Sequence, residues 1–163
     1  MQFHANQGTG GKTFTLEKGT KLGEYMKQLS PKRDGYIFKG WWTVKASGGT
    51  KIVDTDVVTG NAIYYAHWIL PKYTVQFHAN GGTGGKTFTL EKGTKLGEYM
   101  KQLSPKWEGR IFKGWWTKKA GGDRITDTDV VTGNTIYYAH WTLPKYTVQF
   151  HANQGTGGKT FTL

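Results

Sequence analysis

Adjacent tryptophans occur twice in this chain, as Trp41-Trp42 and as Trp115-Trp116, each inside the stretch Lys-Gly-Trp-Trp-Thr. Neighbouring side chains of an extended segment point to opposite faces, so one tryptophan of each pair can enter a core while the other faces outward. An exposed aromatic face can stack on a sugar ring or contact another protein. The residues expected on a ligand or interaction face are Trp42, Trp116, Tyr65, Tyr138, His67, His140, His78, Lys39 and Lys113. The alternative is that each outward aromatic is covered by a neighbouring loop or by the next repeat.

Catalytic chemistry has little support in the sequence. A serine nucleophile requires a base and an orienting acid, and the chain has only three serines. Ser47 has no counterpart in the second copy of the repeat described below, whereas Ser30 and Ser104 each precede a proline. We therefore expect a non-enzymatic protein with no catalytic residue, and the family resemblance described below implies that it has no cofactor.

The acidic pairs and the glycine-rich stretches suggest turns. Asp54/Asp56 and Asp127/Asp129 supply fewer oxygens than the six to eight that Ca²⁺ prefers, and such residues commonly shape turns. The stretch Gly-Gly-Thr-Gly-Gly-Lys lacks the spacing of a phosphate-binding loop and joins two expected strands. His78 and His140 could hold Zn²⁺ or Ni²⁺ weakly if their strands were neighbours in matching register. Otherwise they are solvated surface histidines, and we expect no metal site.

The charge of the chain is strongly positive, with 22 basic and 11 acidic residues. Residues 2–75 carry ten basic and five acidic residues and residues 76–148 carry eleven and six, so each segment has a net charge of +5. Such a surface attracts polyanions in general, including sulfated glycans and teichoic acids. No nucleic-acid-binding motif and no apolar run long enough to span a membrane is present. We therefore expect no specific nucleic-acid partner and no transmembrane segment.

The chain is a tandem repeat. Residues 2–75 align with residues 76–148 with ten substitutions and one deletion, and residues 149–163 are identical to residues 2–16. We predict a first repeat at 1–72 with a truncated opening strand, a second at 73–145, and the opening hairpin of a third at 146–163. The last hairpin either pairs with the preceding repeat or exposes unpaired strand edges, which invite pairing between chains. Self-association through residues 146–163 is therefore expected.

Hydrophobic periodicity predicts the elements of each repeat. In the second copy, alternation predicts strands over 73–80, 87–91, 110–117 and 136–141. Leu96, Met100 and Leu103 have helical spacing, with Thr94 placed to cap the helix and Pro105 just beyond its end. The order strand-strand-helix-strand-strand predicts an α+β fold of tandem, small, β-grasp-like (ubiquitin-like) repeats. The alternative is an all-β sandwich in which residues 94–104 form a loop.

Three segments resemble the Listeria–Bacteroides repeat, also called the B-repeat of the internalin B type, a family of bacterial surface proteins. The matching segments are Tyr73-Thr74-Val75-Gln76-Phe77-His78-Ala79-Asn80-Gly81-Gly82-Thr83-Gly84, Gly35-Tyr36-Ile37-Phe38-Lys39-Gly40-Trp41-Trp42-Thr43, and Val58-Thr59-Gly60-Asn61-Ala62-Ile63-Tyr64-Tyr65-Ala66-His67-Trp68. His78 departs from the family's frequent aspartate, and the second tryptophan departs from its usual tyrosine. Arg110 replaces an aromatic residue.

The resemblance implies a non-enzymatic module of a bacterial cell-surface or extracellular protein, present here as a fragment without its signal and anchor. Its expected role is that of a spacer or stalk and of an adhesion or interaction module. The alternative function is a binding module for carbohydrates or anionic polymers such as glycosaminoglycans or teichoic acids. The expected partners are neighbouring repeats of the chain, together with surface glycans, anionic polymers or a host protein.

Overall fold

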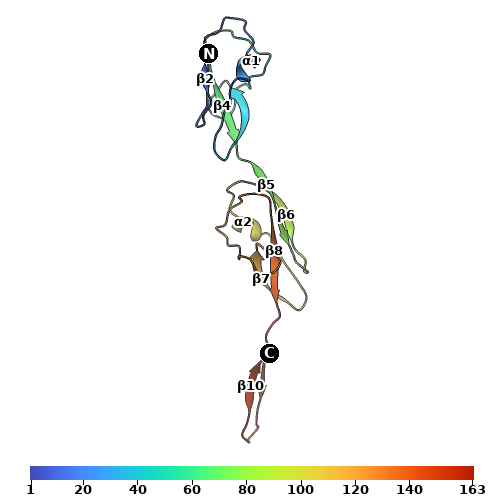
Figure 1. Ribbon diagram of the computed structural model, residues 1–163. Helices are drawn as coiled ribbons and strands as arrows, with labels where there is room; N and C mark the ends of the chain where they lie inside the picture. The colour runs from blue at the N-terminus through green and yellow to red at the C-terminus, as the bar shows by residue number, and fades with distance from the viewer. The chain divides into compact units, whose positions relative to one another are not determined.

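The computed structural model describes all residues, 1–163, as two compact units, Met1–Pro71 and Lys72–Leu163 (Figure 1). Each unit holds one four-stranded sheet with the same strand order. The chain also forms a two-stranded sheet from its last residues.

The sheet of the second unit has the order β6-β5-β8-β7. Its strands are β5 (Lys72–His78), β6 (Lys86–Glu91), β7 (Ile111–Trp116) and β8 (Thr135–Thr142). Strand β5 pairs antiparallel with β6 and parallel with β8, and β7 pairs antiparallel with β8. The opening and closing strands of the repeat therefore lie at the centre of a mixed sheet.

The first unit repeats this arrangement with shorter opening strands. Its elements are β1 (Gln2–His4), β2 (Lys12–Thr13), α1 (Gly23–Met26), β3 (Ile37–Trp42) and β4 (Ile63–Ile69), in the sheet order β2-β1-β4-β3. Strands β9 (Thr147–Phe150) and β10 (Lys159–Thr162) pair antiparallel with each other.

Each unit has its own core on one face of its sheet. The buried core residues of the second unit are Val75, Phe77, Leu90, Leu96, Trp115, Val131, Tyr137 and Ala139. Those of the first unit are Phe3, Leu22, Trp41, Ile52, Val58, Tyr64 and Ala66. Trp41 and Trp115 are each 3% exposed, so the first tryptophan of each pair is the one that enters the core.

The prediction of α+β, β-grasp-like repeats is wrong. The structure is mostly β, with 39% of residues in strands or bridges and 5% in helices. Helix α2 (Gly97–Met100) has four residues, and Leu96 stands at its N-cap without a side-chain cap, so Thr94 does not start it. Glycine at the first helical position weakens propagation, and Ser104-Pro105 prevents extension. The two-sheet sandwich is not observed either, because the four strands of each repeat form a single sheet.

The segment with helical spacing still covers the core. Leu96 is fully buried, and Met100 and Leu103 pack against the core cluster. After the four helical residues the backbone continues in tight turns, in which the amide of Leu103 donates to the carbonyl of Met100. The apolar spacing was therefore a correct indication of burial but not of a sustained helix.

Candidate functional site

The strand register brings aromatic and cationic side chains into one row across the outer face of each sheet. In the first unit, Tyr65 of β4 is the register partner of both His4 on β1 and Trp42 on β3. Trp42 in turn forms an isolated bridge with Lys51 beyond the edge of β3. We call His4, Tyr65, Trp42 and Lys51 the outer row of the first unit.

The second unit has the same outer row with one substitution. Its members are His78, Tyr138, Trp116 and Arg124, as the register and an isolated bridge show. The rings of His78 and Tyr138 are 5.6 Å apart, as are those of His4 and Tyr65. Arginine in place of Lys51 preserves the positive charge at the end of the row.

A β-bulge positions the second tryptophan. The register of β3 against β4 pairs Phe38 with Trp68 and Gly40 with His67, so Lys39 is an extra residue. Gly40 has φ +125°, a conformation that side chains rarely adopt. A Cβ at Gly40 would lie 3.2 Å from the Trp42 ring and 2.8 Å from Cε of Lys51. The glycine therefore leaves the space opposite His67 that the Trp42 ring and the Lys51 side chain occupy.

Both faces of the second tryptophan have partners within the unit. The ring of His67 stacks on Trp42 with centroids 4.4 Å apart and an angle of 5° between the planes. Nζ of Lys51 lies 5.5 Å from the centroid of Trp42. Because β4 and Lys51 lie on opposite sides of β3 in the sheet, the indole stands between histidine and lysine. A sugar could stack on this ring only by displacing one of them.

The second unit reproduces this arrangement closely. Trp116 and His140 stack with centroids 4.3 Å apart and an angle of 5°, and Cζ of Arg124 lies 5.7 Å from the centroid of Trp116. The stacked histidines also fix a loop. Nε2 of His67 donates to the carbonyl of Val44 at 2.8 Å, and Nε2 of His140 donates to that of Lys118 at 2.9 Å.

The histidines of the opening and closing strands are not register partners. His78 faces Tyr138, and its Nδ1 accepts a hydrogen bond from the amide of Asn80 at 3.0 Å. His140 is held by Trp116 and by the Lys118 carbonyl. No group of three or more His, Cys, Asp or Glu side chains is clustered to hold a metal ion.

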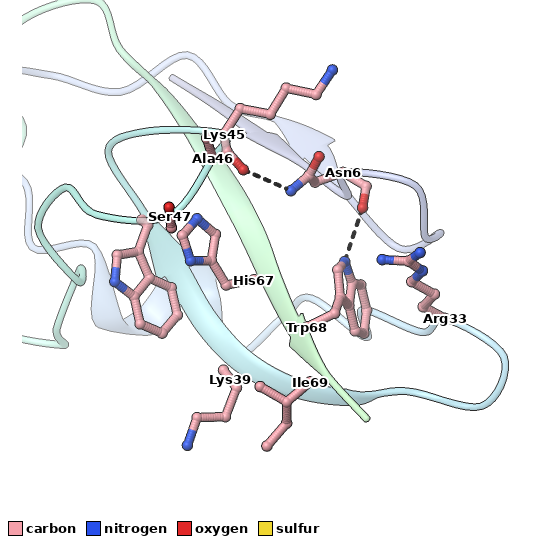
Figure 2. A pocket seen from close by; sticks show the side chains of 10 residues that line it. Asn6, Arg33, Lys39, Lys45, Ala46, Ser47, His67, Trp68 and Ile69 are labelled. Atoms are coloured by element: carbon pink, nitrogen blue, oxygen red, sulfur yellow. Dashed lines mark hydrogen bonds between the residues drawn. The ribbon is translucent and has the colours of Figure 1, made fainter. Parts of the chain in front are cut away.

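A hollow of about 370 Å³ adjoins the outer row of the first unit (Figure 2). Its lining residues are Asn6, Arg33, Lys39, Trp42, Lys45, Ala46, Ser47, His67, Trp68 and Ile69. Three of them are cations, Arg33, Lys39 and Lys45, and none is a carboxylate. We call this the cationic hollow. Its composition suits an anionic ligand with an apolar ring face.

Asn6 and Trp68 shape the wall of the cationic hollow. Asn6 has φ +46°, and its Nδ2 donates to the carbonyls of Lys45 and Ala66 at 3.2 and 2.9 Å. Nε1 of Trp68 donates to the carbonyls of Ala5 and Asn6, both at 3.0 Å. Figure 2 shows Asn6 between the Lys45 loop and Trp68. The first turn of the repeat is thereby tied to both the loop and the closing strand.

The two units differ beside the hollow. Arg33 lies over the ring of Tyr36 at 3.8 Å, whereas in the second unit Arg110 lies over the ring of Trp107 at 4.3 Å. The cation and the aromatic ring have thus exchanged positions. Trp107 also contacts Trp141 edge-on, with centroids 5.8 Å apart. The second unit consequently has an aromatic ring where the first has a hollow-lining cation.

Part of this site follows from the sequence pattern and part does not. Trp42, Tyr65, His67 and Lys39 and their counterparts Trp116, Tyr138, His140 and Lys113 lie on the outer face or at its bulge, as does His78. Lys51 and Arg124 were missed, as were Asn6, Arg33 and Lys45. The sequence signal for this position was that its substitution between the copies, Lys51 to Arg124, keeps the positive charge.

Comparison with known proteins agrees with the repeated structure. The profile of the Listeria–Bacteroides repeat domain matches residues 1–67 and 73–140. A Gly-rich membrane protein of Evansella cellulosilytica is 32% identical over 161 residues, covering 96% of this chain and 18% of that protein. Internalin H of Listeria monocytogenes is 28% identical over 116 residues, covering 69% of this chain and 20% of that protein.

A second membrane protein of Evansella cellulosilytica is 28% identical over 153 residues, covering 88% of this chain and 23% of that protein. The chain therefore spans about a fifth of the length of the curated relatives that it matches. No solved structure matches it. Neither helix of the chain is long or apolar enough to cross a membrane. The chain belongs to the Listeria–Bacteroides repeat family and is a tandem-repeat module similar to segments of proteins named as membrane proteins and as an internalin.

Proposed function

We propose that this chain is a spacer and interaction module of a bacterial surface protein, without enzymatic activity. The observation that carries this proposal is that each unit closes its own core, and the two core clusters share no residue. Strand β4 ends at Ile69 and β5 begins at Lys72, so only two residues join the sheets. A series of such units adds length without requiring any unit to complete another.

Mechanical unfolding tests the spacer role directly. The chain has no cysteine, so handles can be attached through cysteines added at its two ends. We expect two separate unfolding events, each releasing about 240 Å of chain, because an extended residue spans ~3.4 Å. Replacing the core residue Trp41 by Gly should abolish one event and leave the other unchanged. A single event that releases both units together would refute independent spacing.

A second candidate function is the binding of an anionic polymer at the cationic hollow. Its support is that Arg33, Lys39 and Lys45 surround a hollow with no carboxylate in its lining. Sulfate, phosphate and carboxylate groups all interact favourably with such cations. Because His67 and Lys51 cover the two faces of Trp42, the ligand would be held by charge rather than by stacking on that indole.

The binding test uses two variants of equal charge. Lys39→Glu/Lys45→Glu changes the hollow, whereas Lys18→Glu/Lys92→Glu changes exposed lysines in the turns after β2 and β6. With heparin and with a teichoic acid as probes, we expect the first pair to weaken binding at least about tenfold and the second about threefold or less at 0.15 M salt. Equal losses from both variants would mean that only net charge matters, and the hollow would then not be a site.

A further inference from the structure

The first turn of the second unit contains the only Asn-Gly sequence of the chain, Asn80-Gly81. The corresponding asparagines of the other copies, Asn6 and Asn153, are each followed by glutamine. The backbone nitrogen of the residue after an asparagine can attack the side-chain amide of that asparagine. Glycine leaves this nitrogen unshielded, because it has no Cβ. The turns of the copies therefore share the same asparagine but differ in how easily it is attacked.

The attacking nitrogen is accessible in the turn of the second unit. Gly81 is exposed, and no hydrogen bond within the chain holds its amide. Glycine populates positive and negative φ about equally, so the peptide after Asn80 can reorient toward the side chain at low cost. In the first unit Gln7 has φ +71°, and its side chain restricts the same movement.

The side-chain amide of Asn80 ties this turn to the rest of the second unit. Its Nδ2 donates to the carbonyl of Lys119 at 3.1 Å and to that of Ala139 at 2.9 Å. Both bonds must break before Nδ2 can leave, so attack on the side chain requires local opening of the turn. Each hydrogen bond adds only modestly to stability, so this opening is frequent compared with unfolding of the core.

We propose that Asn80 is a deamidation site, which the first unit lacks. The backbone nitrogen of Gly81 loses its proton and forms a bond to Cγ of Asn80. The bond between Cγ and Nδ2 breaks, and Nδ2 takes up a proton and leaves as ammonia. Water then opens the resulting five-membered imide at one of its two carbonyl carbons, which gives aspartate or isoaspartate at position 80. The only co-reactant is water.

The product cannot restore the contacts of Asn80. A carboxylate only accepts hydrogen bonds, whereas the carbonyls of Lys119 and Ala139 both receive a donor from Asn80. Isoaspartate in addition lengthens the main chain of the turn by one carbon atom. The loop after β7 then keeps the bond between His140 and the carbonyl of Lys118 but loses the bond from residue 80. Deamidation therefore loosens this loop in the second unit and leaves the first unit unchanged.

Incubation of the full chain at mildly alkaline pH tests the site, because such a pH favours deprotonation of the attacking nitrogen. Peptides that contain Asn80, Asn6 and Asn153 are then compared by mass spectrometry, with a sample digested before incubation as the background. We expect at least about tenfold more deamidation at Asn80 than at Asn6, because only Asn80 precedes glycine. Equal or lower deamidation at Asn80 would overturn the proposal.

The matched variant is Gln7→Gly, which copies the glycine of the second unit into the first. It should raise deamidation of Asn6 to within about threefold of that of Asn80. Failure to raise it would show that the following glycine is not the cause. In concentrated urea the rate at Asn80 should rise at least about fivefold, because its two side-chain hydrogen bonds are absent there. An unchanged rate would contradict the need for local opening.

The structural consequence has its own measurement. Chains modified at position 80 carry one additional negative charge, so ion exchange separates them from unmodified chains. Hydrogen exchange in residues 117–124 should be at least about fivefold faster in the modified chains, whereas residues 43–51 of the first unit should be unchanged. The variant Asn80→Asp, which has the aspartate product without the imide step, should show the same faster exchange. Full protection of the loop in the modified chains would refute the loosening.

Discussion

Gly81 and Trp107 are predicted to be energetically coupled, because a side chain at residue 81 would occupy the space of the indole. A Cβ built on Gly81 lies 2.5 Å from Cη2 and 2.6 Å from Cζ3 of Trp107. The first unit has Gln7 at the same position with φ +71°, and Arg33 in place of the tryptophan. The perturbation is Gly81→Gln, which copies the first unit's residue into the second unit.

The expected loss of stability has two parts. Gly81 has φ +100°, and a non-glycine residue in a left-handed conformation costs about 1–2 kcal/mol. Displacing Trp107 weakens its edge contact with Trp141, worth about 0.5–1.5 kcal/mol, and the cation–π contact with Arg110, worth about 0.5–1 kcal/mol. Gly81→Gln should therefore destabilise the second unit by about 2–4.5 kcal/mol.

A double-mutant cycle separates these parts. In a Trp107→Arg background the ring is absent, so Gly81→Gln should cost only the backbone part, and the coupling energy should be about 1–2.5 kcal/mol. The mirror experiment in the first unit is Arg33→Trp, which should be tolerated better when Gln7→Gly is also present. Each unit is the control for the other, because a change in one should leave the other's stability unchanged.

Hydrogen exchange measured by mass spectrometry can follow both units in one sample. Peptides covering residues 60–69 and 133–142 differ in mass because Ala62 and Ile69 are replaced by Thr135 and Thr142. Protection of the closing strand reports the opening free energy of its own unit. If Gly81→Gln lowers this free energy equally with and without Trp107, to within about 0.5 kcal/mol, the steric coupling is refuted.

Three further changes test other parts of the fold by the same exchange assay or by urea unfolding. Asn80→Ala should lower the free energy of unfolding of the second unit by about 2–3 kcal/mol, because it removes two side-chain hydrogen bonds at a residue with φ +51°. Asn80→Gly should lower it less, and equal losses would contradict the contribution assigned to the backbone conformation. Gly114→Ala should lower the stability of the second unit by about 1–3 kcal/mol, because residue 114 has φ +125°. If removing the nearby Arg124 side chain restores stability, the cause is a contact with that side chain and not the backbone conformation. Burial, with a smaller contribution from the charge of Asp129, raises the pKa of Tyr137 above its usual value of 10.0. The stability that this group contributes is therefore complete below pH 10 and is lost as pH rises through the raised pKa. Tyr137→Phe should make the urea midpoint fall less steeply at alkaline pH. An unchanged slope would contradict the assignment of this decline to Tyr137.

The strands could be predicted because they depend on local alternation. Phe77 and Ala139 each occupy an apolar position of a period-two pattern and are buried, whereas the bulge at Lys113 puts the buried Trp115 out of phase with Phe112. The helix could not be predicted correctly, because a spacing of apolar residues shows which side chains are buried but not how many hydrogen-bonded turns form. Leu96 meets the core equally well from a single turn.

The outer row was only partly predictable, because its last member comes from a loop without periodicity. Trp42 and Tyr65 follow from strand alternation, but Lys51 joins them through an isolated bridge that closes the loop after β3. The extra residue at Lys39 also shifts the register, so simple counting along β3 does not give the partner of Trp42. Long-range pairing and bulges of this kind depend on tertiary context.

The second tryptophan is best understood together with the glycine two residues before it. Gly40 supplies the bulge and the empty space opposite His67, and Trp42 fills that space while it contacts His67 and Lys51. A tyrosine at this position has a smaller ring and would cover less of His67, whose Nε2 holds the loop at Val44. Trp42 thereby links the closing strand to the loop that carries Lys45, and so to one wall of the cationic hollow. Its contribution to binding would then be to position the loop, so that Trp42→Tyr should weaken anion binding together with loop protection, and Lys45→Glu should weaken binding alone.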